Sequence, residues 1–227
     1  MFKKIKNCFA FTVWFFSYFV VFFLSKIFLS ISVSYEDKKF KGVKSPMLVV
    51  SNHKNLFDPW IIFVSMPFWS YVKLLPIRPF VKNKFSEKKS LLGVLSSLGV
   101  IKFVYFIYNV IVVSNNGDFE DKIKPIVDTL KEKNTVLIFP EGKIILDTEV
   151  GEFKKGAVVV QERTGVPILP CAVRHGKRGL FRKKVSVSFG KITYVPKEFL
   201  NNKEDYSEAR EYLREETLRL YNKKNVG

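Results

Sequence analysis

Two short apolar runs, each followed directly by polar residues, most constrain how this chain can fold. Met47–Val50 leads into a segment that contains His53 and Asp58, and Thr135–Ile138 leads into a segment that contains Glu141. Apolar runs of this length are typical of buried strands. An α/β fold builds its sites in loops at strand ends. We therefore expect both polar segments to lie at one edge of a sheet.

Strand-like and helix-like patterns alternate along the rest of the chain. This alternation predicts an α/β fold in which a mixed sheet is flanked by helices. The expected strands are Met47–Ser51, Tyr71–Leu75, one or two within Val100–Val113, Thr135–Phe139, Val166–Val173, Val185–Phe189 and Ile192–Tyr194. The expected helices are Asp58–Pro67, Phe85–Leu98, Phe119–Lys133, Lys155–Thr164 and Asp205–Tyr221.

The N-terminal segment is hydrophobic enough to enter a membrane. Cys8–Leu24 is a run of 17 uncharged residues, which is near the lower limit for spanning a bilayer. No small-x-small cleavage pattern follows it, so we expect a retained anchor rather than a signal peptide. Lys26 interrupts the apolar pattern, which favours a re-entrant pair of short helices over one span. We assign residues 1–35 to a membrane anchor and 36–227 to a second, globular domain.

A formal net charge of +17 narrows the possible partners. Only four of the charged residues lie among the first 35, so the excess is spread over the globular part. Such a surface suits an anionic membrane or a phosphorylated substrate. We expect no nucleic-acid partner, because no zinc-finger spacing or RNA-binding signature is present. We also expect no metal, because the sequence has two cysteines, two histidines and no carboxylate cluster with ligand spacing.

His53 and Asp58 are candidates for acid–base chemistry. The loop between them can fold so that the carboxylate meets one imidazole nitrogen, which would fix the tautomer and leave the other nitrogen as a general base. A structural alternative is open for Asp58, because an aspartate ahead of Pro59 also suits a helix N-cap. Glu141 is a candidate to hydrogen-bond a substrate hydroxyl, although Pro140 and Gly142 alone would explain a turn.

The H-x4-D spacing of His53 and Asp58, followed by the F-P-E-G segment at 139–142, resembles the glycerolipid acyltransferases of the lysophosphatidic acid acyltransferase type. The resemblance covers roughly residues 36–200. It implies that His53 is the base that takes a proton from a lysophospholipid hydroxyl and that Asp58 orients it. The acyl donor would be acyl-CoA or acyl carrier protein, with no cofactor. Glu141 and Gly142 would bind the acceptor at the cytoplasmic face of the cell membrane.

The chain departs from the family pattern where the acceptor phosphate should bind. The family usually has an arginine shortly after F-P-E-G and another after an earlier strand, and neither is present here. Other cations would have to supply the charge, and we name these candidates: Lys143, Lys154, Lys155, Lys102 and Arg174. Three functions are therefore open. They are acyl transfer to lysophosphatidic acid, acyl transfer to a different lysolipid or hydroxyl acceptor, and a non-catalytic basic module that binds anionic lipid.

Overall fold

The two apolar runs are neighbouring central strands in a computed structural model of the chain, which describes residues 2–37, 40, 42–82, 99–113, 117–146, 149–179 and 181–223. Strand β2 (Met47–Ser51) lies parallel to β5 (Thr135–Ile138), with Val49 opposite Leu137. Parallel strands end at the same sheet edge, so the residues that follow them meet there. The predicted arrangement of the two motifs is thus present.

Within the described residues the sheet has seven strands in the order β1-β7-β6-β2-β5-β3-β4. All neighbouring pairs are parallel except β6 and β7, which form an antiparallel pair. The remaining strands are β1 (Leu29–Tyr35), β3 (Ile77–Lys82), β4 (Ile111–Val113), β6 (Ile168–Arg178) and β7 (Lys183–Phe189).

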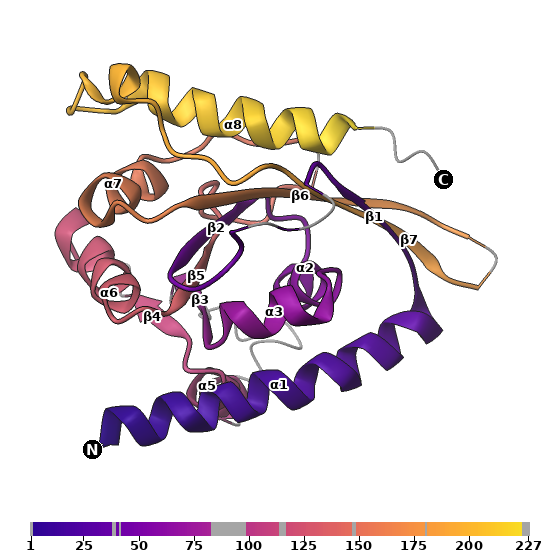
Figure 1. Cartoon of the computed structure of the whole chain (residues 1–227). Helices are drawn as coiled ribbons and strands as arrows, with labels where there is room; N and C mark the ends of the chain where they lie inside the picture. The colour runs from indigo at the N-terminus through magenta and orange to yellow at the C-terminus, as the bar shows by residue number, and fades with distance from the viewer. Residues whose placement is uncertain are drawn as a thin grey trace.

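Helices cover both faces of the sheet (Figure 1). The helices are α1 (Phe2–Phe28), α2 (Asp58–Val64), α3 (Phe68–Leu74), α5 (Val100–Ile107), α6 (Phe119–Lys131), α7 (Gly156–Thr164) and α8 (Ser207–Asn222), with a 3-10 turn at Lys197–Leu200. Successive side chains of a strand point to opposite faces. Accordingly, Leu48 and Val50 pack towards α6, α7 and α8, whereas Met47 and Val49 pack towards α1, α2 and α3. The expected fold class, a mixed sheet flanked by helices, is confirmed.

The N-terminal segment differs from the expectation. One continuous helix, α1, passes through Lys26, so the predicted re-entrant pair of short helices is wrong. Residues 29–35, which we placed in the anchor, instead form β1 at the edge of the sheet beside β7. Ser32 and Ser34 hydrogen-bond to Ser186 and Ser188 across this pair. The alternating sequence of Leu29–Tyr35 is a strand pattern that the length of the apolar run obscured.

Two segments that we expected to be strands form helices instead. Tyr71–Leu75 falls largely in α3, where Tyr71 and Leu74 are one helical turn apart and both buried. The first part of Val100–Val113 forms α5, and only β4 is a strand. Both segments are short and mostly apolar, with Lys73 in one and Lys102 in the other, and such segments do not distinguish a strand from a helix.

Two smaller differences remain, and one expected element is untested. Ile192–Tyr194 makes only an isolated bridge, between Thr193 and Ile168. β3 was not expected at all. The expected helix Phe85–Leu98 lies outside the described residues.

Asn52 extends the pairing between β2 and β6 beyond the end of β2. Its side-chain amide donates to the carbonyl of Val173 at 2.9 Å, and its side-chain oxygen accepts from the Val173 N–H at 2.8 Å. The side chain is fully buried. The Asn52 side chain therefore takes the place of a backbone hydrogen-bonding partner for β6. This contact fixes the point at which the chain leaves the sheet, one residue before His53.

We expect Asn52→Leu to destabilise the protein, because it leaves both backbone groups of Val173 unpaired in the interior. Each unsatisfied buried group costs about 1–3 kcal/mol. The free energy of unfolding, measured by denaturant titration in detergent, should therefore fall by at least the cost of one unsatisfied group. Asn201→Leu is the matched control, because the Asn201 amide bonds to a carbonyl at an exposed site. Equal stability of the two variants would contradict this role of Asn52.

Candidate active site

The two motif loops are joined through the backbone of His53. The His53 N–H donates to Glu141 Oε2 at 2.8 Å, and the His53 carbonyl accepts from the Ile145 N–H at 2.9 Å. Both partners follow β5, whereas His53 follows β2. The loop after β5 therefore holds the histidine backbone from both sides.

The imidazole of His53 lies against Asp58, as the spacing of the two residues predicted. The distance from His53 Nδ1 to Asp58 Oδ2 is 3.2 Å. The ring stacks on Phe139, with 4.1 Å between ring centroids. The side chain is 18% exposed, and its Nε2 has no hydrogen-bond partner among the described residues. This nitrogen is the one that could accept a proton from a bound molecule.

Asp58 does not cap α2, so the structural alternative for this residue is wrong. It is the first residue of the helix, and Phe57 occupies the cap position without a side-chain hydrogen bond. The Asp58 carboxylate turns back instead, and its Oδ2 accepts from the N–H groups of Lys54 at 2.6 Å and Asn55 at 2.7 Å. The motif loop thus closes on its own aspartate.

A second histidine, which the sequence analysis missed, contacts the other oxygen of Asp58. His175 on β6 lies with its Nε2 2.7 Å from Asp58 Oδ1. Burial pushes the pKa of Asp58 upwards, but hydrogen bonds from His175, His53 and two backbone amides outweigh burial, so the pKa lies below its usual value. Asp58 is therefore ionised at neutral pH. The sequence contains no local signal for this contact, because its two histidines are 122 residues apart.

The side chain of Glu141 is held by backbone N–H groups. Its side chain is almost fully buried, and its two oxygens accept from the N–H groups of His53 and, at 2.7 Å, of Gly151. Burial raises its pKa, and these hydrogen bonds oppose the increase only in part. The carboxylate thus links three chain segments, and its expected contact with a substrate hydroxyl stays a prediction. Gly142 follows it with a φ of 68°, a left-handed conformation that suits glycine.

The candidate phosphate-binding cations are dispersed. Lys143 and Lys154 are both exposed and flank Gly142, since the Lys154 ammonium lies 3.3 Å from where a Cβ on Gly142 would be. The ammonium of Lys155 donates to the carbonyl of Glu204 at 2.7 Å, in the segment just before α8.

The other two candidates lie on separate elements. The Arg174 guanidinium packs over the ring of Tyr221 on α8, 6.0 Å from its centroid. Lys102 is exposed on α5, in the segment that we had expected to be a strand. Of the five cations, Lys143 and Lys154 are thus placed around the turn that carries Glu141. The residues 114–116, where the family has one of its arginines, lie outside the described residues.

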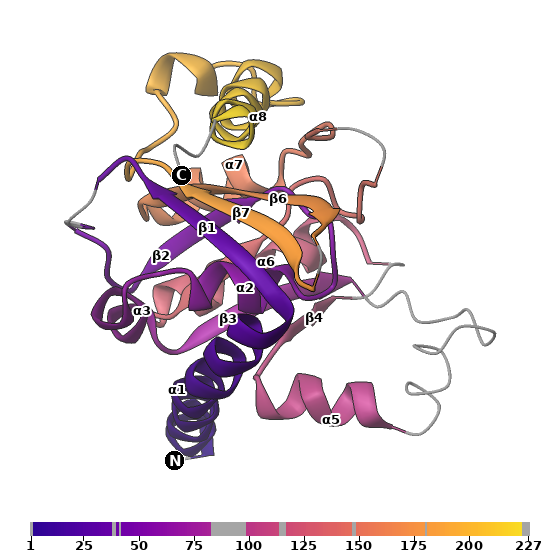
Figure 2. The same cartoon turned by 90° about the vertical axis from the view of Figure 1, so that its right-hand side faces the viewer.

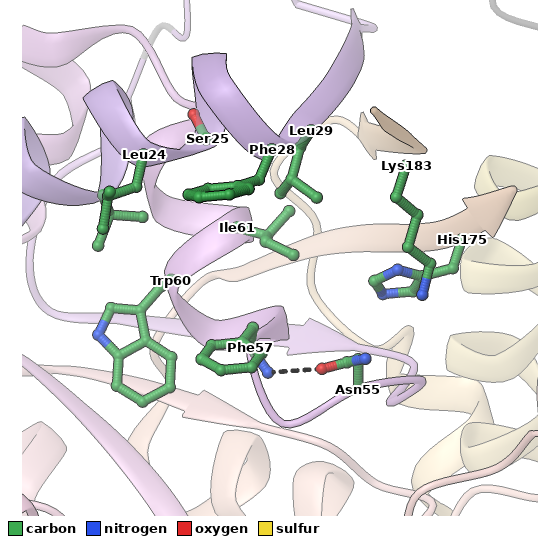
Figure 3. A pocket seen from close by; sticks show the side chains of 11 residues that line it. Leu24, Ser25, Phe28, Leu29, Asn55, Phe57, Trp60, Ile61, His175 and Lys183 are labelled. Atoms are coloured by element: carbon green, nitrogen blue, oxygen red, sulfur yellow. Dashed lines mark hydrogen bonds between the residues drawn. The ribbon is translucent and has the colours of Figure 1, made fainter. Parts of the chain in front are cut away.

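An apolar cavity of about 510 Å³ lies between the C-terminal half of α1 and α2 (Figure 3). Its apolar lining includes Leu24, Phe28 and Trp60, and its polar lining consists mainly of Asn55, His175 and Lys183. The volume is within the range of small-molecule sites. Because Asn55 and His175 both hydrogen-bond to Asp58, the polar end of the cavity adjoins the carboxylate.

Comparison with known proteins identifies relatives of one kind. A 1-acyl-sn-glycerol-3-phosphate acyltransferase of Mycoplasma genitalium, described as probable, is 28% identical over 163 residues, which are 66% of this chain and 57% of the relative. The chloroplastic enzyme BAT2 of Brassica napus, with the same printed activity, is 24% identical over 155 residues, which are 65% of this chain and 40% of the relative. The chain thus spans only about half the length of these curated relatives.

A solved structure shows the same fold. The 1-acyl-sn-glycerophosphate (LPA) acyltransferase PlsC of Thermotoga maritima superposes with a TM-score of 0.52 at 20% identity, covering 85% of this chain and 73% of the other. The family model named Acyltransferase matches residues 32–174, which include β2, β5 and both motif loops. This chain therefore belongs to the acyltransferase family.

Proposed function

We propose that the protein transfers a fatty acyl group from an acyl thioester to the free hydroxyl of a lysophospholipid, with lysophosphatidic acid as acceptor and phosphatidic acid as product. One observation carries the proposal: the His53 imidazole is held by Asp58 at Nδ1, while its Nε2 is free of described partners. That arrangement suits a general base. The printed activities of the curated relatives support the choice of acceptor.

The proposed reaction needs only these groups and the two substrates. Nε2 of His53 takes the proton of the acceptor hydroxyl, and the ionised Asp58 stabilises the imidazolium through Nδ1. The hydroxyl oxygen attacks the thioester carbonyl, and the carbon–sulfur bond breaks. The imidazolium then gives the proton to the leaving thiolate, which departs as the free thiol. We propose no cofactor, and either acyl-CoA or acyl carrier protein as donor, because both are anionic and suit the basic chain.

The apolar cavity beside Asp58 is the proposed place for a fatty acyl chain. Its lining by Leu24, Phe28 and Trp60 supplies the apolar surface that a hydrocarbon chain prefers. One wall of the cavity comes from α1, so a chain bound there would lie next to the part of the protein that we assign to the membrane.

For the membrane itself, we propose attachment to one leaflet through α1. By length and apolar composition, Cys8–Phe28 could cross a bilayer. However, Ala10 and Trp14 are buried against the rest of the protein, and Tyr71 donates a hydrogen bond to the Trp14 carbonyl. The opposite side of α1 exposes large aromatic residues such as Phe16 and Phe23. A helix that is docked along one side and apolar on the other suits the membrane interface.

Other apolar residues lie on the same side of the molecule. Helix α5 contacts α1 and exposes Phe103 and Phe106, and Figure 2 shows the two helices side by side. Together they offer a broad apolar surface, which a soluble monomer rarely exposes. We therefore propose that the protein is located at a membrane surface, on the cytoplasmic side.

We expect His53→Ala to reduce acyl transfer by roughly 100- to 10,000-fold, the usual contribution of a general base. The test is transfer of labelled acyl groups to lysophosphatidate and to a panel of other lysolipids in vesicles, with each donor in turn. Lys124→Ala serves as the control, since Lys124 pairs with Asp128 on the solvent-exposed side of α6. Transfer only to another lysolipid would change the acceptor and keep the mechanism. If the wild type binds anionic vesicles but transfers to no acceptor from either donor, the protein is a binding module.

The acceptor phosphate gives a second test, because Lys143 and Lys154 are the exposed cations around Gly142. We expect Lys154→Ala and Lys143→Ala to raise the KM for lysophosphatidate about 10- to 100-fold, the equivalent of one charge-assisted hydrogen bond, with little change in kcat. The KM for monoacylglycerol, which has no phosphate, should be unaffected. The Lys124→Ala variant is again the control. If KM for both acceptors stays at the wild-type value, the phosphate is bound elsewhere.

A further inference from the structure

His175 is a partly buried polar residue that the proposed reaction does not use. It lies on β6, and its side chain is 13% exposed. Its Nε2 is 2.7 Å from Asp58 Oδ1, a shorter contact than the 3.2 Å between His53 and Asp58 Oδ2. Figure 3 shows its ring on the wall of the cavity near Lys183. Two histidines, one in the loop after β2 and one on β6, thus share one carboxylate.

We propose that His175 is a positioning residue, which donates a hydrogen bond to Asp58 and thereby fixes the carboxylate plane for its contact with His53. This inference rests on the proposed role of His53 as general base. It adds a third member to the pair of residues that the motif spacing predicts. His175 would act through Asp58 and would not itself touch the reacting atoms.

The uneven distribution of donors on Asp58 supports this role. Oδ2 has three donors, the N–H groups of Lys54 and Asn55 and the ring of His53. Oδ1 has His175 as its one donor in the part of the chain that the structure describes. Without a donor on Oδ1, the carboxylate could turn about its Cβ–Cγ bond, and a buried charged oxygen would be left unpaired, which is costly.

The other nitrogen of His175 indicates which form of the ring is present. Nδ1 is buried and has no hydrogen-bond partner in the described part of the chain. A proton there would be a buried N–H without an acceptor, whereas a carboxylate can accept only from a protonated Nε2. The arrangement therefore favours the tautomer with its hydrogen on Nε2. In that form His175 is a donor to Asp58, and its buried Nδ1 is poorly placed to act as a second base.

The backbone fixes the position of His175 through the residue next to His53. Asn52 holds both backbone groups of Val173, as described above. Val173 and His175 are two residues apart on β6, so their side chains point to the same face of the sheet. The contact between Asn52 and Val173 thus fixes two positions: the start of the loop that contains His53, and the part of β6 from which His175 reaches Asp58.

The first test compares two substitutions of His175. His175→Leu removes the donor, whereas His175→Gln retains an amide N–H near the position of Nε2. For acyl transfer we expect the leucine variant to lose about 10- to 100-fold in kcat with KM unchanged, and the glutamine variant to stay within a few-fold of wild type. Lys184→Leu on neighbouring β7 is the control for a polar-to-leucine change on an exposed strand position. Equal kcat for the leucine variant and wild type would overturn the proposal, as would equal losses in both His175 variants.

A second readout does not depend on activity. In protein labelled with ¹⁵N-histidine, the Nδ1–H signal of His53 reports its hydrogen bond to Asp58. We expect this signal to shift or broaden in His175→Leu and to return in His175→Gln. His175→Asn, whose shorter amide does not reach Asp58, replaces the leucine variant if that one does not fold. An unchanged His53 signal in the donor-free variant would refute the positioning role. Failure of the wild type to transfer acyl groups would instead refute the proposed function.

Discussion

The carboxylate of Asp58 has no exposed surface, and a charge in that environment is stable only when hydrogen-bond donors surround it. Its donors come from two parts of the chain, the loop after β2 and the distant strand β6. This requirement shapes the surroundings of the site, because the loop must close on Asp58 and β6 must extend far enough to deliver His175. Both requirements depend on the central pairing of β2 with β6 and β5.

A second buried acid performs a related task for the backbone. Glu141 accepts from the N–H groups of His53 and Gly151, and Ile145 donates to the His53 carbonyl. The backbone of His53 is therefore fixed by the loop after β5, while its imidazole is fixed by Asp58. A general base needs such restraint, because a small displacement of the reacting groups costs a large factor in rate. In this arrangement the two motifs depend on each other.

Several parts of the fold could be predicted from local patterns. Met47–Ser51 and Thr135–Phe139 were predicted as strands from their composition, and Phe119–Lys133 as a helix from the spacing of Ile123, Ile126 and Leu130, three residues that are buried in α6. Two mostly apolar segments were wrongly predicted as strands. Tyr71–Leu74 forms a helix that packs against α2, and Val100–Ile107 forms a helix that contacts α1. Residue composition is a weak guide in such segments, because the tertiary packing can override it.

The sequence by itself determined the fold class, the two strand ends at one edge of the sheet, and the pairing of His53 with Asp58, since a loop with four residues between them brings the two side chains within reach. Only the tertiary structure decided that β1 joins the sheet, that Glu141 binds backbone amides, and that His175 contacts Asp58. The reason is physical. Local spacing limits which near neighbours can meet, whereas a contact between residues 58 and 175 depends on strand order and register, which no short segment specifies.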